Sequence, residues 1–316
     1  MPSLPSLSTL EAFHAWRADA SLCLPTALDI ARHHGLPHRE AKLFATGTNL
    51  VVALDDRLVL KIFPPLLRGQ FNSERVSLSQ LRGRVRVPIP EIVVEGERDQ
   101  WPYLVITRLH GVIGKEAWPA LPEDQKERVL GQIGATIAEV QRAPVGDLSR
   151  IEPRWDRFML GQIDGCRARH VRLGLPQKYL DGLDDFLRDA ATLIPMDAPA
   201  VILTGEYIPE NFLLSRDAEN WNLSGLIDFG DVMTGWGEYD LLGPSSFMTS
   251  GMPRRVRSLF QGFGYTQADL TPGLTRRLMT LALLHRFSDL NRQICIEGWQ
   301  QKAGDLSELA ELLWPM

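Results

Sequence analysis

The stretch AKLFATGTNLVVALDDRLVLKIF, residues 41–63, decides the fold class of this chain of 316 residues. Apolar and β-branched residues gather in three short runs within it, and residues that favour turns separate the runs. The runs span residues 42–45, 50–54 and 58–63, and the turns span residues 46–49 and 55–57. Closely spaced runs of this kind predict three strands of an antiparallel meander.

The residues that follow the meander extend the same sheet. Residues 72–81 place apolar side chains at helical spacing, with Ser73 as a candidate N-cap, and predict a helix. Two more β-like runs follow, near residues 91–95 and 103–107. The sequence therefore predicts five antiparallel strands with one helix inserted after the third.

Helical periodicity dominates on both sides of this sheet. Before it, residues 8–34 predict short helices that break near Pro25. After it, the pattern predicts helices at residues 123–142, 180–194, 274–296 and 305–314, with hairpin strands at residues 201–204, 212–214 and 223–227. We expect an α+β fold of two lobes: residues 1–110, with residues 1–38 as a helical extension, and a larger, mainly helical lobe at residues 111–316. A cleft between two such lobes is a common place for a ligand.

The composition is that of an ordinary globular protein and excludes several function classes. Hydrophobic residues make up 44% of the chain and charged residues 23%, and the net charge is −5. A negative net charge argues against a nucleic-acid partner, and no apolar run approaches the roughly 18 residues of a membrane span. The N-terminus lacks the pattern of a signal peptide, and Cys23, Cys166 and Cys295 show no paired or metal-binding spacing. We expect a cytoplasmic monomer with no nucleic-acid or membrane partner.

Lys61 interrupts the apolar strand LVLKIF. Side chains alternate across a strand, so Lys61 points away from Leu60 and Ile62. If those two face the core, Lys61 faces the other side of the sheet, where Glu74 of the inserted helix can pair with it. An exposed lysine on a sheet face is the alternative.

Two motifs late in the chain carry oxygen ligands. Glu206 and Asn211 are five residues apart in GEYIPEN, and Asp228 follows in GLIDFGD, seventeen residues after Asn211. Amide and carboxylate oxygens are ligands that Mg²⁺ prefers. Ordinary turn chemistry is the alternative for each motif alone. Their order behind a lysine strand and a glutamate helix favours a phosphoryl-transfer site.

The first hairpin turn contains Gly47 and Thr48. A glycine lets the backbone approach a phosphate closely, and a threonine adds a donor. This turn is therefore a candidate cradle for nucleotide phosphates, although a plain hairpin turn explains the same residues.

Together these residues resemble the aminoglycoside phosphotransferases, relatives of choline kinases and distant relatives of protein kinases. The family's loop reads H-G-D-x-x-x-x-N and is followed by I-D-[FW]. Gly205 and Asn211 match the loop, and Ile-Asp-Phe at residues 227–229 matches the second motif. The resemblance extends through WPYLVITRLHG, residues 101–111, and covers roughly residues 40–290. Within the family, the strings VLKIF, WPYLVITRLHG and IDFGDV are most similar to hygromycin B phosphotransferases.

The resemblance implies that the two lobes form a protein-kinase-like fold and that the protein is a kinase that uses ATP or GTP. Lys61, braced by Glu74, would bind the α- and β-phosphates of the nucleotide. Backbone groups near Thr107 and Leu109 would hydrogen-bond the purine base.

The resemblance also implies the groups around the transferred phosphoryl. Asn211 and Asp228 would hold Mg²⁺, and Glu206 would accept the proton of the acceptor hydroxyl. Asp240 is expected to brace the catalytic loop rather than to touch substrate.

The acceptor that the family implies is a small cationic molecule, an aminoglycoside such as hygromycin B. A polycation favours acidic side chains, so the candidates are Asp231, Glu238 and Asp289, with Trp236 as a platform for a sugar ring. His285, on the apolar run LALLHRF, is interpreted as a core histidine.

Two departures from the family pattern leave alternatives open. Thr204 replaces the usual histidine of the loop, and Glu206 replaces the aspartate. One alternative is a nucleotide-binding pseudokinase. Another keeps the chemistry and changes the acceptor to a choline-like, homoserine-like or macrolide molecule.

Overall fold

The computed structural model describes residues 3–45 and 47–316 and divides the chain into two compact units. The first unit contains residues 1–82, 88–110 and 227–232, and the second contains residues 83–87, 111–226 and 233–316. Thr46, part of the first predicted turn, lies outside the described residues. None of the described helices has the length and apolar character needed to cross a bilayer.

The first unit is built on one antiparallel sheet, in the order β1-β2-β3-β5-β4. Its strands are β1 (Lys42–Leu43), β2 (Leu50–Ala53), β3 (Leu58–Ile62), β4 (Ile92–Arg98) and β5 (Trp101–Thr107). Its helices are α1 (Leu10–Ala18), α2 (Ala20–His33) and α3 (Arg68–Leu81), the last preceded by a 3₁₀ turn at Pro65–Leu67. The predicted five-stranded sheet with one inserted helix is confirmed.

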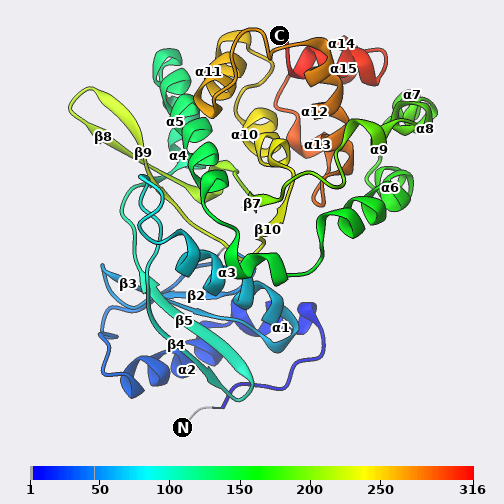
Figure 1. Ribbon diagram of the computed structural model, residues 1–316. Helices are drawn as coiled ribbons and strands as arrows, with labels where there is room; N and C mark the ends of the chain where they lie inside the picture. The colour runs from blue at the N-terminus through cyan, green and yellow to red at the C-terminus, as the bar shows by residue number, and fades with distance from the viewer. Residues whose placement is uncertain (1–2, 46) are drawn as a thin grey trace. The chain divides into compact units, whose positions relative to one another are not determined.

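Helices cover both faces of this sheet. In Figure 1, α2 and α3 lie on opposite sides of it. The core beside α1 and α2 contains Phe13, Ile30, Leu60 and Ile62. Since Leu60 and Ile62 are committed to this core, β3 presents Lys61 to the side of α3.

Three local predictions in the first unit are wrong. The break in the N-terminal helices falls at Asp19, whose side chain caps α2, and Pro25 lies inside α2. The inserted helix begins at Arg68, so Ser73 is a buried residue of its interior rather than its N-cap. The strand expected at residues 42–45 is only two residues long.

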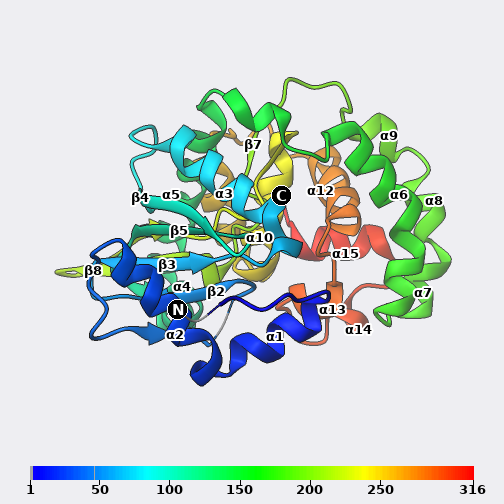
Figure 2. The same ribbon diagram turned by 90° about the horizontal axis from the view of Figure 1, so that it is seen from below.

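The second unit is mainly helical. Its helices are α4 (Gly114–Ala117), α5 (Glu123–Arg142), α6 (Trp155–Arg172), α7 (Gln177–Asp181), α8 (Leu183–Leu187), α9 (Ala190–Leu193), α10 (Leu242–Phe247), α11 (Pro253–Phe263), α12 (Pro272–Leu284), α13 (Leu290–Gln293), α14 (Trp299–Lys302) and α15 (Leu306–Leu313). Two small sheets accompany them: β6 (Val112–Ile113) with β8 (Phe212–Asp217) and β9 (Asn220–Leu226), and β7 (Val201–Leu203) with β10 (Met233–Gly235). Figure 2 shows α6 to α9 gathered together.

Helices α5 and α11 make the closest helix pair of this unit (Figure 1). A Cβ atom at Gly134 would lie 2.1 Å from the carbonyl oxygen of Leu259, and one at Gly262 would lie 2.1 Å from that of Gly131. Glycine is therefore required where the two backbones meet.

Long-range packing overrides three predictions in this unit. The helix expected at residues 274–296 ends at Leu284, because His285 turns to extended backbone. The helix expected at residues 180–194 is replaced by α7, α8 and α9. Strand β7 pairs with β10 and is not part of the β8–β9 hairpin.

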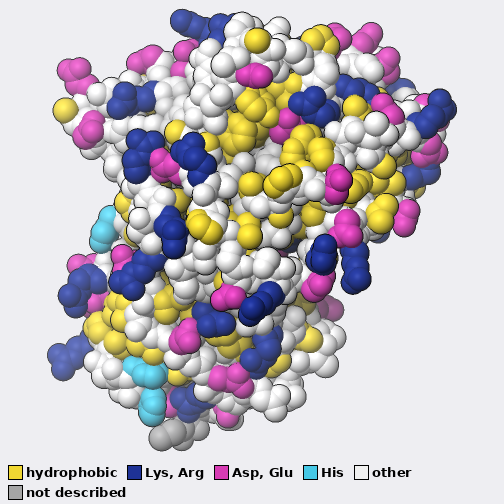
Figure 3. Space-filling view, viewed as in Figure 1, with side chains coloured by type: hydrophobic (Ala, Val, Ile, Leu, Met, Phe, Trp, Pro, Cys, Tyr) yellow, Lys and Arg dark blue, Asp and Glu magenta, His cyan; other side chains and the backbone are white. Residues whose placement is uncertain are grey.

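The molecular surface carries both signs of charge. On the face that Figure 3 shows, basic and acidic side chains are interspersed with hydrophobic ones over α10 and α12.

Candidate active site

The candidate site in the first unit centres on Lys61. Helix α3 supplies Glu74 on the face to which β3 directs this lysine, and the Lys61 Nζ atom lies 2.5 Å from Glu74 Oε2. Both side chains are buried. The predicted ion pair is confirmed, and the exposed-lysine alternative is excluded.

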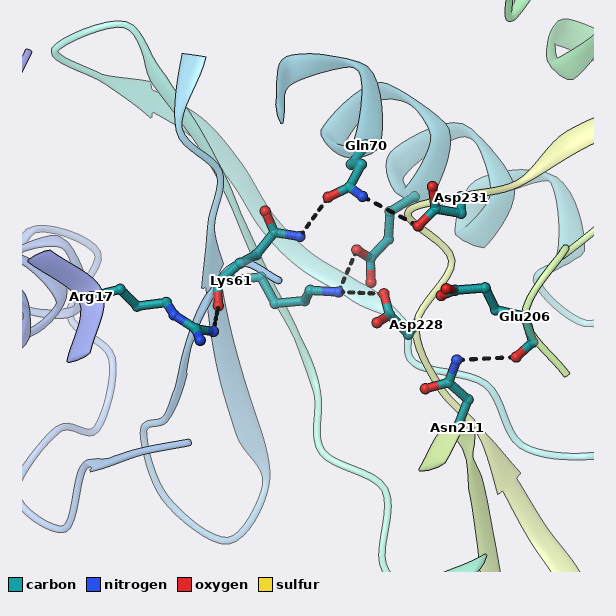
Figure 4. A network of polar contacts seen from close by, with 9 residues as sticks. Arg17, Lys61, Gln70, Glu206, Asn211, Asp228 and Asp231 are labelled. Atoms are coloured by element: carbon teal, nitrogen blue, oxygen red, sulfur yellow. Dashed lines mark hydrogen bonds and ion pairs between the residues drawn. The ribbon is translucent and has the colours of Figure 1, made fainter. Parts of the chain in front are cut away.

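Asp228 completes this cluster. Its Oδ1 atom lies 3.2 Å from Lys61 Nζ (Figure 4). Burial lowers the pKa of Lys61, but the charges of Asp228 and Glu74 outweigh burial and raise the pKa above its usual value. Lys61 is therefore a cation, and removing either carboxylate would leave a buried charge poorly compensated.

Asp228 is held in an uncommon backbone conformation. Its φ angle is 66°, in the left-handed region that aspartate tolerates better than most residues. Its side chain remains 36% exposed. One carboxylate can therefore contact Lys61 and still offer oxygen to a hard cation.

A polar chain links helix α1 to the segment that follows Asp228 (Figure 4). Arg17 donates to the carbonyl oxygens of Gly47 and, at 2.9 Å, Asn49. Asn49 Nδ2 donates to Gln70 Oε1 at 3.0 Å, and Gln70 Nε2 donates to Asp231 Oδ2 at 3.2 Å. Sequence analysis missed Arg17 and Gln70 because neither lies in a recognisable motif.

We expect Arg17→Ala to raise the KM for the nucleotide about tenfold with little change in kcat, because the turn at residues 47–49 loses bonds from a charged donor. Steady-state kinetics with varied nucleotide would measure this. Arg32→Ala removes an exposed arginine of α2 and is the control. An unchanged KM in Arg17→Ala would show that the turn does not need this anchor.

The other nucleotide candidates occupy different settings. Thr48 is exposed in its turn, and Gly47 has a φ angle of 100°. The backbone N–H of Thr107 already donates to the carbonyl oxygen of Glu91. The backbone of Leu109 has no hydrogen-bond partner among the described residues. Its N–H and C=O groups, unlike the N–H of Thr107, are therefore free to bond a purine base.

The candidate site in the second unit centres on the loop that follows β7. Asp240 Oδ2 accepts from the backbone N–H of Thr204 at 3.0 Å, and its Oδ1 accepts from that of Gly205 at 2.9 Å. Burial raises the pKa of Asp240 to about 7, although these two donors oppose the rise. The predicted role of Asp240 as a brace of the loop is confirmed.

Glu206 follows this brace directly and is fixed by its own backbone. Its carbonyl oxygen accepts from Ile208 N–H at 2.8 Å and from Asn211 Nδ2 at 3.0 Å (Figure 4). The second bond orients the Asn211 amide and leaves its Oδ1 without a partner among the described residues. The loop therefore presents one carboxylate and one oriented amide oxygen.

His285 contacts the same loop from the end of α12. Its ring stacks on Tyr239, with centroids 4.5 Å apart, and its Nδ1 accepts from Phe287 N–H at 3.2 Å. It also forms a hydrogen bond with the Gly205 backbone, and burial lowers its pKa to about 3. Since Nδ1 accepts, the neutral ring carries its proton on Nε2. His285 is buried as predicted, but it also supports a loop in which Thr204 replaces the family's histidine.

The neutral state of His285 makes stability depend on pH. Its pKa is near 6.5 in the unfolded chain and about 3 in the folded one. The stabilisation that the neutral His285 ring contributes is therefore complete above pH 6.5 and is lost as the pH falls towards 3. At pH 5 the free energy of unfolding has fallen by about 2 kcal/mol. We expect His285→Gln to flatten the fall in unfolding free energy between pH 7 and pH 5, measured by chemical denaturation.

Some pH dependence should remain in that variant, because burial also lowers the pKa of His170. The exposed His14, replaced by Gln, is the matched control and should leave the slope as in the parent protein. An unaltered slope in His285→Gln would mean that His285 is already charged in the folded protein.

The predicted acceptor residues do not form one group. Glu238 is buried, and its Oε1 accepts from Tyr265 Oη and from Arg277 Nη2, both at 2.8 Å. The same arginine lies 5.8 Å from the ring of Trp236. Asp289 lines a cavity that Glu206 also lines, whereas Glu238 and Trp236 do not line it.

Family membership follows from the sequence. The sequence model of the phosphotransferase enzyme family matches residues 41–272, which contain Lys61 and both late motifs. The chain belongs to this family. Asn211 and Asp228 belong to the two late motifs.

The chain is also similar to individual proteins of known name. An aminoglycoside 3'-phosphotransferase from Streptomyces ribosidificus is 28% identical over 153 residues, 46% of this chain and 53% of that protein. The chain thus spans about half the length of this curated relative. The GDP complex of wild-type aminoglycoside 2'-phosphotransferase-IIIa superposes with a TM-score of 0.68, at 20% identity, over 92% of this chain and 96% of that one. A macrolide 2'-phosphotransferase from Brachybacterium faecium, an apoenzyme, gives a TM-score of 0.58, at 17% identity, over 92% and 98%. The two structures show a shared fold.

Proposed function

We propose that this protein is an O-phosphotransferase that moves the terminal phosphoryl group of ATP or GTP to a hydroxyl of a small molecule. The observation that carries the proposal is the buried cluster of Lys61, Glu74 and Asp228. A buried lysine held as a cation by two carboxylates, one of them partly exposed, suits the binding of nucleotide phosphates with their metal ion. The GDP bound in one structural relative is consistent with a nucleotide ligand.

Chain connectivity supports a metal held jointly by Asn211 and Asp228. Asn211 directly precedes Phe212, which pairs with Leu226 in the β8–β9 register. Asp228 follows Leu226 by two residues, a span of at most about 7 Å. The unpartnered Asn211 Oδ1 and the partly exposed Asp228 carboxylate are hard oxygen donors that fit Mg²⁺.

The remaining residues have two roles, phosphate binding and proton transfer. Lys61 neutralises phosphate charge, and bound Mg²⁺ supplies further charge neutralisation at the transferred group. Glu206 orients the acceptor hydroxyl and takes its proton as the new O–P bond forms. The bond from the terminal phosphorus to the bridging oxygen breaks, and the nucleoside diphosphate leaves.

A pseudokinase is the second candidate, because Glu206 and Thr204 depart from the family's loop. The retained brace from Asp240 and the oriented amide of Asn211 favour an active loop. We therefore favour the enzyme.

The test is release of nucleoside diphosphate from Mg-ATP and Mg-GTP with a panel of acceptors. The names of the relatives make aminoglycosides the first class to include and macrolides the second. Within the first class, hygromycin B is the narrowest candidate, from the strings VLKIF, WPYLVITRLHG and IDFGDV. Acceptor-dependent turnover would support the proposal. Nucleotide binding without turnover on any acceptor would favour the pseudokinase.

A further inference from the structure

The cavity that Glu206 lines has a volume of about 440 Å³, and all of its lining comes from the second unit. This volume is in the range of small-molecule sites. Its charged lining residues are Arg169, Arg172, Arg286, Arg292, Glu206 and Asp289. Four guanidinium groups face two carboxylates, so the lining has a formal charge of +2 with His285 neutral. Apolar side chains, including Phe247 and Phe287, supply much of the remaining surface.

Much of this positive charge is not neutralised within the second unit. Arg172, the last residue of α6, is exposed and has no partner among the described residues. Arg169 donates to Gln162 Oε1 and to the carbonyl oxygen of Leu283, which are both neutral groups. Its charge therefore remains available to a ligand.

Arg292 is also weakly engaged. Its side chain is 85% exposed, and its Nε atom lies 3.7 Å from Asp289 Oδ2. Exposed ion pairs of this length contribute little, so Arg292 can turn to a ligand at small cost. The helix dipole explains basic residues at the end of α6, but it does not explain Arg286, which lies between α12 and α13. Arg292 lies in α13, which has only four residues.

This charge opposes a polycation and favours an anion. An aminoglycoside would bring several ammonium groups against the guanidinium groups of Arg169, Arg172 and Arg292, and like charges in a partly enclosed cavity repel. Guanidinium groups bind carboxylates and phosphates with paired hydrogen bonds.

We infer that the acceptor is a hydroxy compound that also carries an anionic group on a partly apolar body. Arg172 and Arg292 bind the anionic group while the hydroxyl lies at Glu206. The part played by the hydroxyl rests on the proposed function, whereas the anion site rests on the cavity alone.

The test uses a pair of probes of nearly equal size and shape, the anion 4-(hydroxymethyl)benzoate and the neutral 4-(hydroxymethyl)benzamide. Titration calorimetry at low salt should show the benzoate binding at least about tenfold more tightly than the amide. The double variant Arg172→Glu with Arg292→Glu should lose this difference. Arg257→Glu, a reversal at an exposed arginine of α11 outside the cavity, should keep it. Thermal unfolding would confirm that both variants remain folded.

Two results would overturn the inference: equal affinity for the two probes, or an unchanged preference in the double variant. Diphosphate release with kanamycin but no benzoate binding would also overturn it, while leaving the proposed function intact. Arginine-dependent benzoate binding by a protein that fails to bind nucleotide would support the anion site and refute the kinase.

Discussion

Asp228→Ala is expected to lower kcat for phosphoryl transfer by at least about a thousandfold. Asp228 is the exposed partner of Lys61 and a proposed ligand of Mg²⁺, so its loss removes charge stabilisation at the transferred phosphoryl and a fixed contact of the buried lysine. Release of nucleoside diphosphate measures the rate, either with an acceptor or as slow hydrolysis without one. Equilibrium binding of a fluorescent nucleotide should weaken less than the rate falls, because Lys61 retains Glu74.

Two further variants make this result specific. Asp228 has a φ angle of 66°, where alanine is strained by roughly 1 kcal/mol, so Asp228→Asn tests the charge in a residue that tolerates this conformation. It should also lose most activity, and thermal unfolding should show that it is destabilised but still folded at the assay temperature, because Lys61 keeps Glu74 as a partner. Asp217→Ala removes an exposed aspartate at the end of β8 and should keep full activity. An Asp228→Asn protein that retains more than about a tenth of the parent rate would contradict the assigned role.

The fold was predictable where the pattern is local. The meander at residues 41–63 consists of short apolar runs separated by turns a few residues long, and these turns contain residues that form turns in most contexts. The end of α12 was not predictable, because His285 leaves the helix to stack on Tyr239, a residue that lies far away in sequence. The partner of β7 was hidden for the same reason, since β10 follows it by about thirty residues.

The candidate site was also predictable from sequence only where the pattern is local. Lys61 and Glu74 could be paired from sequence, because strand alternation and helix placement determine which face each side chain occupies. Arg17 and Gln70 could not, because their role depends on contacts with the turn around Asn49 that no local pattern encodes. The charge of the cavity was also hidden, because Arg169 and Arg172 lie more than a hundred residues before Arg286 and Arg292, and the two pairs meet only in the folded unit.

The catalytic loop leaves Glu206 little freedom to move. Asp240 accepts hydrogen bonds from the backbone of the two residues before Glu206. Asn211 donates to the carbonyl oxygen of Glu206. The backbone at Glu206 is therefore pinned on both sides, and the reach of the carboxylate depends on the length of the side chain. Thr204 is buried at the position where the family pattern has a histidine, so a smaller side chain packs at the start of this loop.

Glu206→Asp is therefore expected to lower kcat by on the order of a hundredfold, because a carboxylate withdrawn by about 1 Å no longer meets the acceptor hydroxyl. Glu206→Gln, which keeps the length and removes the base, should lose about as much or more. Glu210→Asp shortens an exposed glutamate of the same loop, paired with Lys115 on the surface, and should leave kcat unchanged. Acidity does not distinguish the two carboxylates, since glutamate and aspartate differ by only about 0.4 in pKa. A large gain of activity in Glu206→Asp would thus have one physical meaning: the loop still has the geometry of an aspartate enzyme, and the glutamate is a lesion in it.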